Sequence, residues 1–151
     1  MTRQNPNSVP DSQLLQVVLR PSQRQVGRWS TVHWEFELVD GPGATEPPPG
    51  GWSGRIALVL HRDEVDDYRL NLASETPRLF LICSRGETDD HLIPRKLGIS
   101  AGEAAAHLET DDEVLSCPLP TGLRDWIAAY TVLVPINPEV QRRKGSKRRR
   151  V

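Results

Sequence analysis

Residues 29–38 alternate strictly between two kinds of side chain, and this alternation constrains the fold more than any other feature of the chain. One set is largely apolar and consists of Ser30, Val32, Trp34, Phe36 and Leu38. The other set is Trp29, Thr31, His33, Glu35 and Glu37. A period of two with one apolar side is typical of a half-buried β-strand. The segment from Arg28 to Asp40 therefore predicts a strand that packs one face on a core.

Further strands are expected on both sides of this one. Residues 14–20 are rich in β-branched and aliphatic residues and end at Pro21. Residues 55–61, 67–72 and 78–84 are strand-like runs separated by an acidic turn at 62–66 and by a polar turn at 74–77. Their spacing of about ten residues indicates antiparallel neighbours. Residues 91–97 predict a sixth strand, at a sheet edge because Pro94 interrupts it.

The last third of the chain predicts helices. Ser100 and Glu103 have the spacing of a capping box, which predicts a short helix over 101–109. A second helix is expected to begin with Thr121 as its cap and to end at Pro135. Its apolar stripe recurs at helical spacing and comprises Leu123, Trp126, Ile127, Tyr130 and Val134.

Sheet residues first and helices last predict an α+β domain rather than a parallel Rossmann-type arrangement. We expect a curved antiparallel sheet of five or six strands, or a small open barrel, with one short helix and a C-terminal amphipathic helix. The domain is expected to span residues 13–135, with a flexible Pro- and Gly-rich loop at 40–54. Residues 1–12 and the basic tail 136–151 predict disorder.

The net charge of −1 conceals a strong asymmetry along the chain. Residues 139–151 hold seven basic residues and one acidic residue, which leaves 12 basic and 19 acidic residues in 1–138, a net charge of −7. An acidic body repels nucleic acid and anionic membranes, so such binding would fall to the tail. The sequence has neither a long apolar run nor a hydrophobic signal core, and we expect a cytoplasmic protein that does not bind membranes.

Residues 60–83 contain the densest group of ionisable side chains in the expected domain: His61, Arg62, Asp63, Glu64, Asp66, Asp67 and Tyr68. A metal-binding or catalytic role is disfavoured, because cation-binding loops space their oxygen ligands regularly and turn at a glycine that is missing here. Two interpretations remain open. The segment is either a charged hairpin in which Arg62 and Arg69 neutralise carboxylates, or an acidic surface that binds a basic partner.

Other candidate groups are sparser. His33, His91 and His107 stand apart from one another, and Cys83 and Cys117 are interpreted as buried thiols, so we predict no catalytic residue, metal site or cofactor. Trp34 and Trp126 are expected in the core, whereas Trp29 and Trp52 are candidate protein-binding residues. The tail cations are candidate contacts to an acidic protein, or weakly to nucleic acid: Arg142, Arg143, Lys144, Lys147, Arg148, Arg149 and Arg150.

The order of these motifs from Leu14 to the C-terminus resembles the proteobacterial family of domain of unknown function 3305. The resemblance rests on a Trp-rich strand like Arg28–Glu35, a core like Leu60–Glu64 followed by Tyr68 and Pro77, a helix start like Ser100–Ala104, and Pro118-Leu119-Pro120 before Trp126. The resemblance implies a role connected with molybdenum enzymes of the formate dehydrogenase type, because the genes of family members tend to lie beside the genes of such enzymes.

Some members also carry a label for molybdopterin guanine dinucleotide synthesis, and the residues argue against that activity here. The string Gly50–Arg55 is similar to a nucleotidyltransferase phosphate loop, yet it precedes a strand instead of following one. A phosphate loop needs the order strand, loop, helix. We therefore expect a noncatalytic accessory protein for maturation or assembly of a molybdenum-dependent oxidoreductase, bound to a subunit or maturation factor. The alternative is a small nucleic-acid-associated or regulatory protein that uses the basic tail.

Overall fold

The computed structural model describes residues 9–40, 46–86 and 91–133. The strands are β1 (Ser12–Val26), β2 (Trp29–Leu38), β3 (Trp52–Val59), β4 (Arg78–Arg85), β5 (Leu92–Gly98) and β6 (Glu113–Pro118). The helices are a 3-10 turn η1 (Arg62–Glu64) and the α-helices α1 (Val65–Ala73), α2 (Ala101–Leu108) and α3 (Thr121–Leu133). The predicted α+β class is confirmed.

The strands form two antiparallel three-stranded sheets, with the orders β2-β1-β3 and β5-β4-β6. The sheets approach each other where β3 lies beside β5 and β2 beside β6, but neither pair is joined by a strand ladder in the described residues. The prediction of one curved sheet is therefore wrong, and the barrel is not closed. The reason is that the chain leaves β3 through a helix, so β4 starts a second sheet instead of pairing with β3.

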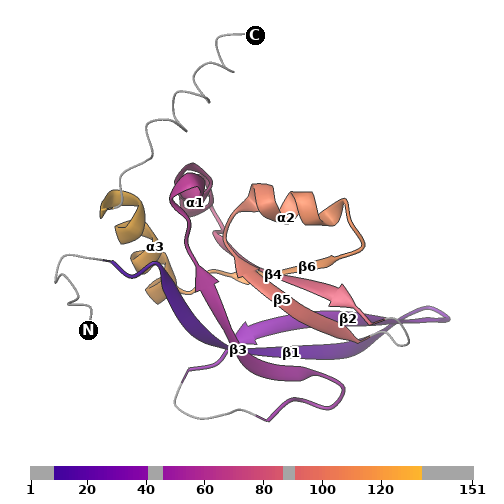
Figure 1. Cartoon of the computed structure of the whole chain (residues 1–151). Helices are drawn as coiled ribbons and strands as arrows, with labels where there is room; N and C mark the ends of the chain where they lie inside the picture. Colours follow the sequence, from indigo (N-terminus) through magenta and orange to yellow (C-terminus); the bar gives the residue numbers. More distant parts are fainter. Residues whose placement is uncertain (1–8, 41–45, 87–90, 134–151) are drawn as a thin grey trace, which may run out of the picture.

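Figure 1 shows α1 and α2 on one side of the β5-β4-β6 sheet and the other sheet on its far side, while α3 lies beside α1 at the end of the molecule. The core lies between these layers and is built largely of aliphatic residues that are almost completely shielded from solvent. It includes Val17, Leu19, Leu58, Leu79, Leu81, Leu97 and Ile127, each 1% exposed or less. Each such side chain contributes about 1.5–3 kcal/mol through burial, which fixes the sheets against each other.

The predicted strand at 67–72 is wrong, because these residues belong to α1. Tyr68, Leu70 and Leu72 mimic strand alternation, but Leu70 is 72% exposed. The buried residues of the helix are Val65, Tyr68 and Asn71, spaced three apart as on one face of a helix. The acidic turn at 62–66 is likewise η1 and the first turn of α1, so the charged segment is not a hairpin.

The two later helices follow the sequence pattern. The Ser100 hydroxyl accepts a hydrogen bond from the Glu103 amide at 3.1 Å, as a helix N-cap does. In α3, Leu123, Trp126, Ile127 and Tyr130 are buried as predicted, whereas Val134 lies outside the described residues. The longest helix of the described part has 13 residues, and none of its helices is long and apolar enough to cross a membrane.

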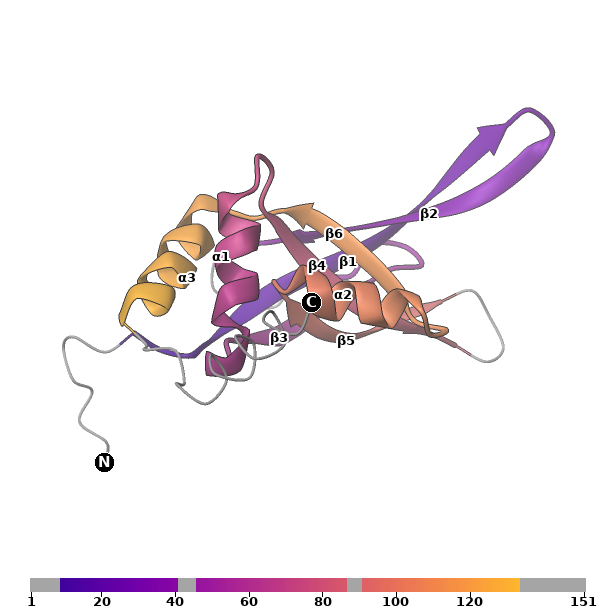
Figure 2. The same ribbon diagram turned by 90° about the horizontal axis from the view of Figure 1, so that it is seen from above.

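Strand β1 continues past Pro21 to Val26, although we expected it to end at that proline. The pairing with β3 stops at Leu19, and at Pro21 only β2 lies alongside, opposite Trp34. A proline is tolerated there because its missing N–H faces the open side of the strand. Strands β1 and β2 therefore extend as a two-stranded hairpin beyond the body, as Figure 2 shows.

Parts of two segments that we expected to be flexible belong to the folded domain. Pro10 accepts a hydrogen bond from the Trp126 indole at 2.8 Å, and Asp11 accepts one from the Leu60 amide at 2.7 Å. Residues 9–12 are therefore held to the domain. At the other segment, residues 52–54 belong to β3, so the expected loop at 40–54 is shorter; residues 1–8 and 41–45 lie outside the described part.

Candidate functional site

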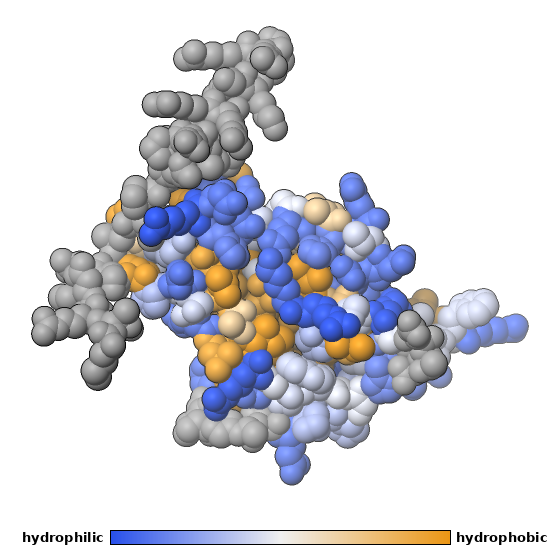
Figure 3. Space-filling model, viewed as in Figure 1, coloured by the Kyte–Doolittle hydropathy of each residue, from blue (hydrophilic) through white to orange (hydrophobic). Residues whose placement is uncertain are grey.

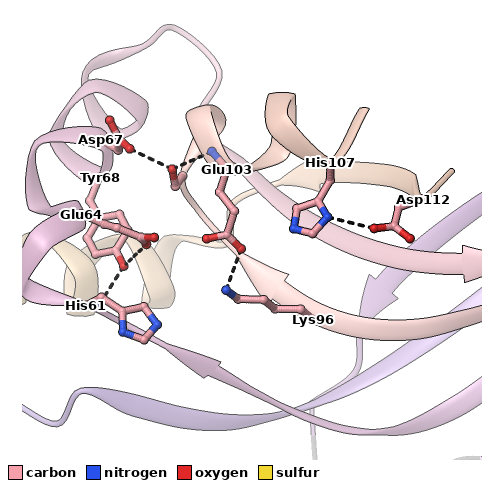
Figure 4. A network of polar contacts seen from close by, with 9 residues as sticks. His61, Glu64, Asp67, Tyr68, Lys96, Glu103, His107 and Asp112 are labelled. Carbon is pink, nitrogen blue, oxygen red and sulfur yellow. Dashed lines mark hydrogen bonds and ion pairs between the residues drawn. The ribbon is translucent and has the colours of Figure 1, made fainter. Parts of the chain in front are cut away.

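A network of polar contacts joins η1 and α1 to α2 and β5, and Figure 4 shows its members. Its residues come from segments far apart in the sequence: His61, Glu64, Asp67 and Tyr68 on one side, and Lys96, Ser100 and Glu103 on the other. The charged segment singled out from the sequence therefore faces a second helix.

Tyr68 lies at the centre of the network and is 1% exposed. Its hydroxyl accepts a hydrogen bond from the His61 amide and donates one to Glu64 Oε2, both at 2.8 Å. Burial raises the pKa of Tyr68. The hydroxyl is thus a neutral donor that ties the chain before η1 to the first residues of α1.

The carboxyl groups of Glu64 and Glu103 interact across the gap between η1 and α2. Burial raises the pKa of Glu64; the hydrogen bond from Tyr68 offsets part of this rise, and the negative charge of Glu103 adds to it. Burial acts in the same direction on Glu103, but Lys96 and the contact with Glu64 lower its pKa overall. The pKa values of these two neighbouring carboxyls thus move in opposite directions, that of Glu64 upward and that of Glu103 downward.

Lys96 holds Glu103 in its ionised form. The ammonium nitrogen of Lys96 lies 2.7 Å from Glu103 Oε1, and the Glu103 side chain is only 18% exposed. One turn later on α2, His107 Nδ1 lies 2.9 Å from Asp112 Oδ2. Both contacts connect α2 to neighbouring segments, and they place one cation and one imidazole near the carboxyl pair.

Two further contacts fix α1 in place. Asp67 Oδ2 accepts a hydrogen bond from the Ser100 hydroxyl at 2.9 Å, so the residue that caps α2 also binds α1. The Asn71 amide donates to the carbonyls of Arg78 and Ile99 and accepts from the Arg78 amide at 2.8–2.9 Å. These bonds make α1 a connector between α2 and β4.

The network places two carboxyls with oppositely shifted pKa values beside one lysine, but it gathers few metal-binding groups. Nowhere in residues 9–40, 46–86 and 91–133 do three His, Cys, Asp or Glu side chains assemble in a way that could hold a metal ion. The two buried residues of the network, Tyr68 and Ser100, each make two hydrogen bonds to other protein groups.

The structure divides the candidate residues 61–68 into two groups. The first group is exposed and contains His61, Arg62 and Asp63. In the second, Glu64, Asp67 and Tyr68 contact other protein groups, while Asp66 is half-buried, 4.0 Å from the Arg69 guanidinium. The segment is therefore not one continuous acidic surface. Lys96, Ser100 and Glu103 were not predicted as partners of it, because no local pattern relates residues more than 30 positions apart.

The second candidate surface is the hairpin arm, which we define as residues 22–33. Every residue of the arm is exposed on both faces of the hairpin. We expected Ser30 and Val32 to face a core, and this is wrong because β2 reaches the body only from Trp34 onward. Trp29 is 77% exposed and sits opposite Val26, which is 67% exposed. The two residues lie beside the turn at Gly27, whose φ of +62° suits glycine.

Trp52, the other candidate tryptophan, is placed differently. It begins β3, is half-buried and packs against the core. Its ring also lies over Gly54, where an added Cβ would come within 2.6 Å of ring atoms. Trp52 therefore contributes to packing, and Trp29 is the aromatic side chain that stands free.

Apolar side chains are also exposed elsewhere on the body. In the view of Figure 3 they reach the surface across the middle of the molecule, among hydrophilic residues. The strongly exposed ones outside the arm are aliphatic and come from several elements: Leu14, Val59, Leu70, Ile93, Leu108 and Val132. A pocket of about 610 Å³ lies where β1 and the end of β2 meet the start of α3, and none of the sequence-predicted site residues lines it.

Both cysteines are free thiols. Burial raises the pKa of Cys83 to about 12 and that of Cys117 to about 11, so both stay protonated near neutral pH. Cys83 is fully buried as expected, while Cys117 is partly exposed. Neither is activated as a nucleophile, because activation needs a lowered pKa. The candidate tail residues 142–150 lie outside the described part of the chain.

Comparison with known proteins places this fold in a family. The model of the family described as "Protein of unknown function (DUF3305)" matches residues 51–144, from the start of β3 to beyond α3. No curated protein and no solved structure gives a significant match. The matched range contains the whole polar network and more than half of the chain. The resemblance, which we inferred from Leu14 to the C-terminus, is confirmed for the family over residues 51–144. The chain belongs to the DUF3305 family.

Proposed function

We propose that the protein is a noncatalytic accessory protein that binds a partner protein during maturation or assembly of a molybdenum-dependent oxidoreductase such as formate dehydrogenase. The operating context comes from the family resemblance. One structural observation carries the noncatalytic part of the proposal: the central ionisable residues of the charged segment are used to hold the domain together.

Tyr68 and Glu64 illustrate this point. A catalytic acid or base needs to reach a substrate atom. The Tyr68 hydroxyl is instead buried and occupied by the His61 amide and by Glu64, and Asp67 is occupied by the Ser100 cap. The side chains left for contact with other molecules are the exposed ones. Such an arrangement favours a role in binding over a role in chemistry.

Deletion of the gene tests the proposed function. The deleted strain should show reduced formate dehydrogenase activity, and the purified enzyme should carry less molybdenum cofactor per subunit. Complementation with the wild-type gene should restore both values. Unchanged activity together with normal cofactor loading would contradict the proposal.

Complementation with Glu64→Gln separates binding from chemistry. The glutamine keeps an oxygen that can accept the Tyr68 hydrogen bond but removes the titratable group. If the protein is noncatalytic, this variant should restore formate dehydrogenase activity to the wild-type level. Loss of activity with normal amounts of folded protein would indicate an acid–base role for the carboxyl pair.

A further inference from the structure

We infer that the hairpin arm is a docking element whose tip inserts Trp29 and Val26 into an apolar pocket rimmed by carboxylates on a partner protein. The inference deepens the proposed function by assigning a surface and the chemistry of its partner, and it relies on that function only for the choice of the first probe.

The first argument is the exposure of the arm. All twelve residues from Ser22 to His33 are exposed. An isolated two-stranded hairpin is marginally stable in water, since it lacks a layer that covers either face. Ordering such a segment costs conformational entropy without burial to offset it. A partner that covers the tip would supply the missing burial.

The second argument is the side chains that share one face of the arm. Directly paired residues of an antiparallel ladder point to the same side, and the side alternates along the strand. The register pairs Val26 with Trp29 and Arg24 with Thr31 two positions away, so Trp29, Val26 and Arg24 lie on one face. Tryptophan and arginine are among the residue types that most often dominate the binding energy at protein interfaces.

The third argument is charge, and it selects the partner. The segment between Asp11 and Glu35 contains no acidic residue, but it contains three basic ones, Arg20, Arg24 and Arg28. Arg20 pairs with Glu37 at 3.2 Å, but neither Arg24 nor Arg28 forms an ion pair within the described residues. Two unpaired cations beside an apolar pair complement a pocket with carboxylates at its rim.

The charge distribution also favours a protein over a nucleic acid as the occupant. Two free arginines neutralise few phosphates, and affinity for nucleic acid depends on many such contacts. Residues 1–138 carry a net charge of −7, which repels a polyanion that approaches the arm and the body together. A partner protein whose carboxylates are confined to the rim of one pocket would contact only the arm, so the acidic body would repel it less than it repels a polyanion.

The first experiment measures binding of the purified catalytic subunit of the molybdenum-dependent formate dehydrogenase to the full-length chain by biolayer interferometry. Trp29→Ala should weaken binding about thirtyfold. The double variant Arg24→Gln/Arg28→Gln should weaken it less and reduce its dependence on salt. Leu108→Ala and Arg124→Gln are matched controls, exposed on α2 and α3, and should bind as the wild type does.

Equal binding by wild type and Trp29→Ala would overturn the inference and leave the proposed function intact. If the catalytic subunit does not bind the wild-type chain, the proposal that this subunit is the partner fails. Site-specific photo-crosslinking in the source organism then tests whether the hairpin arm docks on another protein. A photoreactive residue at position 29, but not at position 108, should form an adduct with one protein. That protein, once purified, should show the same ranking of variants.

An absence of adducts above the position 108 control would refute the inference. Two further results would do the same by assigning the arm another occupant. The first is a duplex-DNA shift at physiological salt that Trp29→Ala abolishes. The second is a dimer in sedimentation velocity that Trp29→Ala dissociates.

Discussion

Replacement of Tyr68 by phenylalanine tests whether the charged segment is structural. The change removes one oxygen from a fully buried ring and leaves the packing intact. That oxygen accepts from the His61 amide and donates to Glu64, both at 2.8 Å. A net loss of about 1 kcal/mol per hydrogen bond gives a destabilisation of about 2 kcal/mol.

Tyr130→Phe is the matched control. Tyr130 is 2% exposed, and its ring centroid lies 6.4 Å from that of Tyr68. Its hydroxyl makes a single long hydrogen bond of 3.4 Å to the Leu60 carbonyl. Removing this weaker bond should cost less than about 1 kcal/mol.

The assay is urea denaturation followed by tryptophan fluorescence, since Trp126 is buried in the core. The midpoint should fall for Tyr68→Phe clearly more than for Tyr130→Phe, with an unchanged slope of free energy against urea. If Tyr68→Phe is no less stable than Tyr130→Phe, the hydroxyl does not hold the segment, and the structural interpretation of Glu64 and Tyr68 is refuted.

Three further predictions concern Glu64, Asn71 and Gly51. Because the pKa of Glu64 is raised in the folded state above its usual value of 4.5, the stability that Glu64 contributes is present at low pH and is lost as pH rises. The unfolding free energy of Glu64→Gln minus that of wild type should therefore increase from about pH 4.5 upward and then level off, and a decrease of this difference with rising pH would refute the sign. Asn71→Ala removes three hydrogen bonds to Arg78 and Ile99 and should cost about 3 kcal/mol by urea denaturation, whereas a cost within error of zero would contradict the connector role of α1. Gly51→Ala would bring a Cβ within 2.2 Å of the Leu19 carbonyl and should cost about 2 kcal/mol, while Gly122→Ala, which meets nothing within 4 Å, should not destabilise; equal melting temperatures would show that the β1–β3 contact is not tight.

The sequence predicted elements well where periodicity was long and unambiguous. The stripe from Leu123 to Tyr130 recurs over about two turns, and its burial was confirmed. Residues 67–72 were too short to distinguish, because Tyr68, Leu70 and Leu72 fit a strand while Val65 and Tyr68 fit a helix. The buried residue that completes the helical face is Asn71, a polar residue whose partners lie at positions 78 and 99.

The candidate site was less predictable than the fold. The charged residues at 61–68 were identified from the sequence, but their contacts with Lys96, Ser100 and Glu103 depend on how α2 packs on α1. The alternation at 29–38 indicated a strand without indicating where the body ends. Val32 therefore looked like a core residue, although it is 45% exposed in the arm.

Complementation of the deletion strain with two single variants tests the central claim most directly. The claim is that the protein acts through an exposed docking arm while its carboxyl network maintains the fold. Formate dehydrogenase activity is measured at equal levels of accessory protein. We predict that Glu64→Gln restores activity and Trp29→Ala does not. Full activity with Trp29→Ala, together with no activity with Glu64→Gln, would contradict the account.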